Sequence, residues 1–73
     1  MLFYRDGREV WLYDRILRGT DMALVLEIVE GDEVARKRYE APGLLVLLLD
    51  ECTFTRILST SPTWDTVSLY RRQ

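Results

Sequence analysis

The chain has 73 residues, and its ten basic and twelve acidic residues give a formal net charge of −2, so no strong global field draws it to nucleic acid or to an anionic membrane. The hydrophobic share of 48% is far from the composition of disorder, and the length fits a single small globular domain over residues 1–73. One cysteine excludes an intrachain disulfide and with it a disulfide-stapled secreted scaffold, so a reducing cytoplasm is the expected compartment.

The first expected element is a β-hairpin over residues 2–11. Asp6-Gly7 lies between two runs rich in aromatic and β-branched residues, and Asp-Gly is a strong signal for a two-residue turn. With this pair as the central turn, Arg5 faces Arg8 and Phe3 faces Val10. In the competing interpretation Asp6 is the N-cap of a helix that ends at Gly19. The hairpin is the preferred interpretation.

The next expected element is a strand over residues 22–29, MALVLEIV. Alternation places Met22, Leu24, Leu26 and Ile28 on one side and Ala23, Val25, Glu27 and Val29 on the other, so both sides are largely apolar. The turn signal at Gly31-Asp32 and the alternation in residues 34–39 predict a second hairpin.

A buried strand over residues 44–49, LLVLLL, follows the break at Pro42-Gly43. Its six apolar residues are far fewer than the roughly 20 that a membrane-spanning helix needs, so no membrane contact is expected. Thr53, Phe54 and Thr55 continue as extended chain. Residues 62–72 remain open: Ser61-Pro62 is typical of a helix start, whereas the β-branched and aromatic residues that follow favour a final strand, which we prefer.

These elements predict a mainly β fold, a small antiparallel sheet or partly open barrel of five to six short strands; the alternative is an α+β fold with one or two short helices. Two strands are apolar on both faces, yet the chain is too short to build a third layer over them. The outward aliphatics are therefore expected to form an exposed patch of Leu45, Leu47, Leu49, Val25 and Val29. Such patches mark interfaces, so an oligomer is expected, with a dimer as the first candidate.

Catalytic chemistry has little support in the residues. The chain contains no histidine, which removes the commonest general base and a common metal ligand, and no cofactor or metal is expected. Asp50 and Glu51 are adjacent and point to opposite faces of a strand, so they do not converge. Cys52 beside them is expected to be a buried apolar thiol. A small enzyme that uses Asp50, Glu51 or Asp14 with an arginine is the weakest function class.

Two short basic clusters give an alternative binding function. The first contains Arg36, Lys37, Arg38 and Tyr39, and the second contains Arg71 and Arg72. If they met, they could form a modest groove for nucleic acid or a nucleotide. Glu33 and Glu40 flank the first cluster and oppose this interpretation.

The function predicted first is a non-catalytic interaction or regulatory module that self-associates or binds a protein partner through an apolar sheet face. Such a module would also suit a phage or mobile-element protein. Aromatic anchors carry much of the energy of protein interfaces. The predicted partner interface therefore consists of Leu45, Leu47, Leu49, Trp11 and Trp64.

Overall fold

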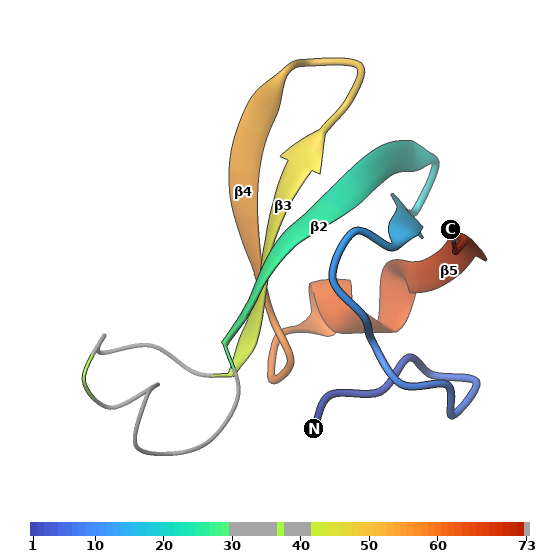
Figure 1. Cartoon of the computed structure of the whole chain (residues 1–73), viewed down its shortest axis with the longest axis vertical. Coiled ribbons are helices and arrows are strands. Elements are labelled where there is room, and N and C mark those ends of the chain that lie inside the picture. Colours follow the sequence, from blue (N-terminus) through green and yellow to red (C-terminus); the bar gives the residue numbers. More distant parts are fainter. Residues whose placement is uncertain (30–36, 38–41, 73) are drawn as a thin grey trace.

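In its described residues the protein is a five-stranded open antiparallel sheet with one short 3₁₀ helix (Figure 1). The computed structural model describes residues 1–29, 37 and 42–72. Within these residues the strands are β1 (Arg15–Arg18), β2 (Asp21–Val29), β3 (Gly43–Leu48), β4 (Thr53–Leu58) and β5 (Val67–Arg71), and η1 (Pro62–Thr66) precedes β5. The strand order is β4-β3-β2-β1-β5, so β4 and β5 are the two edges. The predicted mainly β fold is confirmed, and residues 1–29 and 42–72 contain no α-helix of the kind that the α+β alternative required.

A two-residue loop joins β1 to β2. Arg18 pairs with Asp21, which leaves Gly19 and Thr20 as the loop, and Gly19 has a φ of 63°. A positive φ matches the twist of tight hairpin turns, and glycine adopts it at little cost. Strand β1 therefore forms within the segment for which a helix that ends at Gly19 was the competing interpretation.

Strand β2 confirms the strand predicted over residues 22–29, but its alternation is broken by a bulge. The register with β3 shifts between Val25 and Glu27, so Leu26 is the extra residue. Val25 and Val29 are buried, with exposed fractions of 0% and 2%. The prediction that they lie on the exposed patch is wrong, because Val25 faces inward and Val29 packs at the end of the sheet opposite Gly43.

Strand β3 confirms the strand predicted over residues 44–49 except for Leu49, which lies just beyond its end, and its pairing with β4 has no register shift. Leu44, Val46 and Leu48 are buried, whereas Leu45 and Leu47 are only half-buried. This period of two is the pattern of a strand with one face on the core. The side of β3 that carries Leu45 and Leu47 is therefore the outer face of the sheet.

The N-terminal hairpin exists, but its register differs from the prediction by one residue. Phe3 bridges Glu9, and the Tyr4 N–H donates to the Arg8 carbonyl at 2.8 Å. The loop therefore has three residues and ends on Gly7, with a φ of 94°. Three-residue hairpin loops favour glycine at that position. Arg8 is thereby released from facing Arg5, and it pairs with Asp6 at 2.6 Å.

The C-terminal segment combines the two interpretations that the sequence left open. Pro62 opens η1, as its fixed φ favours, and Ser61 precedes it without making a side-chain cap. The β-branched Val67 then begins β5, which pairs with β1. The preferred final strand is confirmed for residues 67–71.

The inner face of the sheet is closed by the N-terminal segment and by η1. Tyr4 and Val10 join the buried residues of the strands, and Leu2 and Trp64 pack against them. One face of the two-sided apolar strands is thereby covered.

In the described ranges no helix is long and apolar enough to cross a membrane. The second hairpin was predicted to include residues 34–39, which lie outside the described residues except for Lys37. Among the described residues β2 pairs with β1 and β3.

Candidate interaction site

An apolar row crosses the outer face of the sheet. Residues directly opposite each other on antiparallel strands share a face, so the register places Phe54, Leu47 and Leu24 side by side on three strands. Neighbouring pairs extend the row in the same way. We call this surface the outer patch, and it consists of Leu17, Met22, Leu24, Leu45, Leu47, Leu49 and Phe54.

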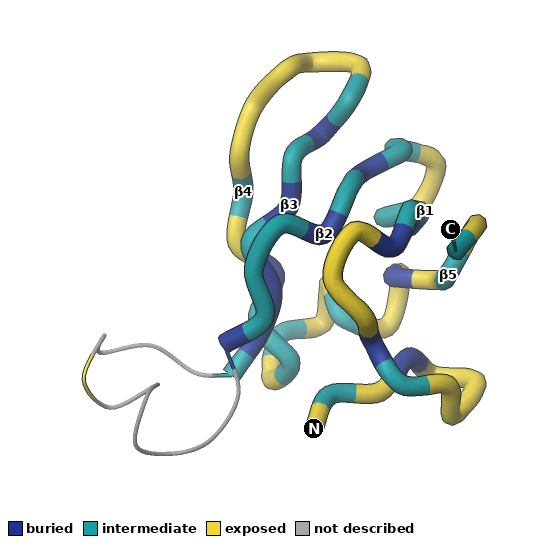
Figure 2. The backbone as a smooth tube through the Cα atoms, in the orientation of Figure 1, coloured by how far each residue is buried: buried dark blue, intermediate teal, exposed yellow. Residues whose placement is uncertain are grey.

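The outer patch is accessible to solvent. Phe54 is 66% exposed, and the other members are half-buried. Figure 2 shows the alternation of buried and half-buried positions along β3. Leu49 lies just beyond β3, where its N–H donates to the Met22 carbonyl at 3.0 Å. The predicted positions of Leu45, Leu47 and Leu49 on an outward-facing surface therefore agree with the register. Met22, Leu24, Leu17 and Phe54 extend the patch in place of Val25 and Val29.

Charged residues border the outer patch. Arg15 lies opposite Leu24, and Arg71 lies opposite Arg15 at one end of the row. In a neighbouring cross-strand row Leu45 lies between Arg56 and Glu27. An apolar centre with an arginine-rich polar rim is the usual composition of a protein interface.

The two predicted tryptophan anchors lie away from the outer patch. Trp11 is 52% exposed in the turn before β1, where the Arg72 guanidinium stacks over its ring at 3.8 Å from the centroid. Trp64 is half-buried in η1 and packs against the core on the inner side. The structure therefore does not bring either tryptophan together with the three leucines.

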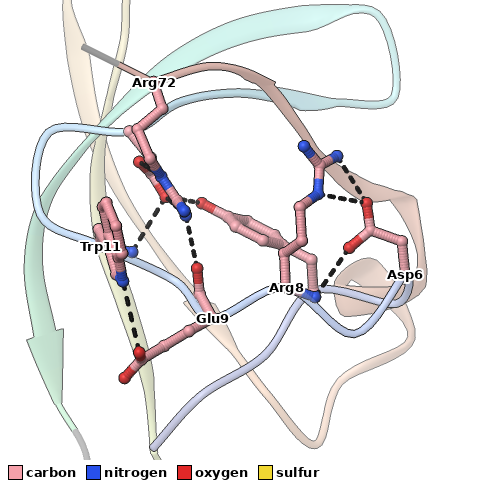
Figure 3. Close-up of polar contacts among 7 residues, drawn as sticks. Asp6, Arg8, Glu9, Trp11 and Arg72 are labelled. Atoms are coloured by element: carbon pink, nitrogen blue, oxygen red, sulfur yellow. Dashed lines mark hydrogen bonds and ion pairs between the residues drawn. The ribbon is translucent and has the colours of Figure 1, made fainter.

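A buried carboxylate joins the N-terminal segment to the C-terminal end of the described chain (Figure 3). Asp14 has an exposed fraction of 1%. Its Oδ2 accepts hydrogen bonds from the Tyr4 hydroxyl at 2.6 Å and from the Trp11 N–H at 2.9 Å. Arg72 donates Nε to Oδ1 and Nη2 to Oδ2, both at 2.9 Å. Arg72 also donates to the Glu9 carbonyl at 2.5 Å.

The hydrogen bonds hold Asp14 in its charged form. Burial by itself raises the pKa of Asp14, but the bonds from Arg72, Tyr4 and the Trp11 amide outweigh it, so the pKa lies below its ordinary value of 3.8. Burial, with the hydrogen bond to Asp14, raises the pKa of Tyr4 well above 10.0. Both carboxylate oxygens are occupied by donors of the chain itself. The Asp14 cluster therefore ties the N-terminal segment to Arg72 just beyond the end of β5.

These two shifts predict opposite losses of stability at the pH extremes. The folded-state pKa of Asp14 is lowered, so its contribution is present above pH 3.8 and is lost as the pH falls below that value. The folded-state pKa of Tyr4 is raised, so its contribution is present below pH 10.0 and declines as the pH rises further. We expect the thermal midpoint, followed by circular dichroism, to fall at both extremes.

Tyr4→Phe is the control for the alkaline loss, because it removes the ionisable hydroxyl and keeps the ring. This variant should lack the steep decline above pH 10.0 and keep the acid decline. An alkaline decline of wild-type size in the variant would assign the effect to other groups.

The predicted carboxylate pair lies in the turn between β3 and β4. Asp50 and Glu51 are both exposed, and Glu51 accepts a hydrogen bond from the Thr53 hydroxyl at 3.4 Å. Cys52 is also exposed, so the expectation of a buried thiol is wrong. Its φ of 52° places it in the turn before β4 begins, and its Sγ lies 3.7 Å from the Leu49 carbonyl.

The two predicted basic clusters have different outcomes. Arg36, Arg38 and Tyr39 lie outside the described residues, and Lys37 is exposed. Arg71 is exposed on β5, whereas Arg72 forms an ion pair with Asp14 and stacks on the Trp11 ring. Arg72 therefore has a structural partner, Asp14, that the sequence analysis missed, and the signal for it was a single acidic residue directly after the apolar run of residues 10–13.

Within the described ranges no group of three or more acidic or cysteine side chains is placed to hold a metal ion. No family model, curated protein or solved structure matches the chain. The outer patch and the Asp14 cluster therefore have to be interpreted from their own geometry.

Proposed function

We propose that the protein is a non-catalytic interaction module that buries the outer patch against another protein surface, with a second copy of the chain as the first candidate. The observation that carries this proposal is the apolar row that extends from the exposed ring of Phe54 across Leu47 to Leu24. Apolar area that leaves water on association contributes roughly 25 cal/mol per Å² before the costs of binding are subtracted.

The two faces of the sheet differ in what lies on them, and this difference supports the proposal. The inner face is covered by the chain itself, through Tyr4, Val10 and the residues packed on them. The outer patch is bordered by arginines, and arginine is enriched at protein interfaces. A free, exposed cysteine at position 52 is compatible with a reducing compartment, and we place the module in the cytoplasm.

Leu47→Arg tests the proposal. Leu47 lies at the centre of the outer patch, and the half-buried position lets the arginine stem lie on its neighbours while the guanidinium reaches water. We expect the sheet to fold and the association to weaken at least about tenfold, which is roughly 1.4 kcal/mol. Light scattering across a concentration series measures the particle mass, and circular dichroism checks the fold.

Leu12→Arg is the matched control, because Leu12 is 51% exposed but belongs to the turn before β1 and not to the outer patch. It should leave the mass unchanged. High salt should leave an apolar association intact or strengthen it, whereas binding to nucleic acid through arginines would weaken steeply. A Leu47→Arg protein with the mass of wild type would reject the outer patch as an interface.

A further inference from the structure

Strand β4 is, among the residues that the structure describes, an edge strand whose backbone pairs with another strand on one side. Among the described residues β4 pairs only with β3, and the strand order places it at the end of the sheet. Thr53, Phe54 and Arg56 are exposed and Thr55 is half-buried, as Figure 2 shows along this strand. An edge of this kind offers a row of N–H and C=O groups that can pair with another strand.

The other edge strand carries features that oppose such pairing, and β4 does not. The pairing of β5 with β1 is irregular between Arg15 and Ile16. The N-terminal turn lies beside the start of β5, since residues 4–6 and 65–68 line one cavity of about 160 Å³. Strand β4 has six residues, a register without a shift, no proline and a single charge, Arg56. Bulges, prolines and repeated charges are the usual protections of an edge.

We propose that two copies of the chain join through their β4 strands, antiparallel about a two-fold axis at Thr55, to form one continuous sheet of twice five strands. Opposite residues of a continuous sheet share a face, so Phe54 of each copy lies opposite Arg56 of the other. The arginine plane can then stack on the phenyl ring twice across the axis. An arginine that stacks by its face keeps its N–H groups for other partners.

Two neighbouring registers that keep the faces matched are less favourable. An axis at Arg56 places the two guanidinium groups directly opposite each other, and like charges in that position repel. An axis at Phe54 places Arg56 opposite Cys52, which precedes β4, so only Thr53, Phe54 and Thr55 of each copy remain paired. The axis at Thr55 pairs Thr53 through Ile57 and gives complementary neighbours on the outer face.

This contact goes beyond the proposed function, because it uses the edge of the sheet and leaves most of the outer patch uncovered. The two outer patches become one wider apolar surface, with Phe54 of each copy at the seam. The edge contact and the outer-patch contact can therefore be present together or separately.

A charge-swap series tests the edge contact. Phe54→Arg places an arginine opposite Arg56 of the second copy, and we expect at least a tenfold loss of association by light scattering. Phe54→Arg with Arg56→Glu converts the repulsion into two opposite-charge pairs and should restore the wild-type particle mass. Both side chains are exposed, so the fold should survive, which circular dichroism checks. Tyr70→Arg is the control on the other edge, since Tyr70 is 58% exposed on β5, and it should leave the mass unchanged.

The outcomes separate the edge contact from the outer-patch contact. Rescue of the mass by the double variant supports the edge contact, whatever Leu47→Arg does. A double variant as dissociated as Phe54→Arg, or a wild-type chain that is monomeric from micromolar to millimolar concentration, overturns it. If Leu47→Arg leaves the mass unchanged while the charge-swap series behaves as expected, the outer-patch proposal fails and the edge contact stands.

Discussion

Replacement of Asp14 by alanine is expected to cost about 3 kcal/mol of stability or more, because it leaves the Trp11 N–H and the buried Tyr4 hydroxyl without their acceptor and removes the partner of Arg72. A chain of 73 residues has a total stability of roughly 4–11 kcal/mol. The loss is therefore a large fraction of the total. Urea unfolding followed by tryptophan fluorescence measures it.

Asp6→Ala is the matched control for Asp14→Ala. Asp6 also pairs with an arginine of the chain, Arg8, at 2.6 Å, but both side chains are about half exposed. Exposed pairs of this kind contribute little, so the unfolding midpoint should stay close to that of wild type. Equal midpoints for the Asp14 and Asp6 variants would mean that the buried cluster does not hold the fold.

Gly43→Asn is expected to destabilise the sheet by about 3 kcal/mol, because there is no room for a side chain at that position. A Cβ added to Gly43 would lie 2.3 Å from the Ile57 carbonyl oxygen and 2.9 Å from the Leu58 Cα. Both atoms belong to the backbone of β4, so β3 and β4 would have to move apart. Urea unfolding is again the measurement.

Gly19→Asn separates lack of space from backbone conformation. A Cβ at Gly19 would have no neighbour within 4 Å, although the φ of 63° is positive. Asparagine tolerates that conformation better than most residues, so the cost should stay within about 1 kcal/mol. Similar losses at the two glycines would mean that the close approach of β4 to Gly43 has been overestimated.

The strands were the most predictable part of the fold. The largely apolar run of residues 22–29 predicted β2, and the break at Pro42-Gly43 with the extended chain that follows predicted a strand over residues 44–49, where β3 lies. The bulge at Leu26 could not be predicted, since nothing in the alternation marks an extra residue. Val25 precedes the bulge and lies on the same side of β2 as Ala23, so it is buried because that side, and not the side of Leu24, faces the core.

The hairpin shows how local turn signals fail by one residue. Asp6-Gly7 predicted a two-residue loop, but the positive φ lies at Gly7 alone, as the last position of a three-residue loop. The shift places Tyr4 inside the fold, where its hydroxyl meets Asp14. A one-residue change of register exchanges the two sides of a strand, so the identity of the buried aromatic depended on it.

The candidate site was also predicted only in part, because some of its contacts depend on the register between strands. The three leucines of β3 and its turn could be assigned to an outward side because they alternate. Phe54 and Leu24 join them through cross-strand register, and the contact of Asp14 with Arg72 spans 58 positions. Contacts at that separation have no local signature in a single sequence.

The pairing of β1 also has a consequence for the order in which the chain folds. Its partner β2 follows after a two-residue loop, whereas its partner β5 comes from the far end of the chain, and the bond from Arg72 to Asp14 closes a loop of 58 positions. Long loops are slow to close and lose more entropy than short ones. The meander from β1 to β4 is therefore expected to assemble first, and the docking of β5 completes the sheet.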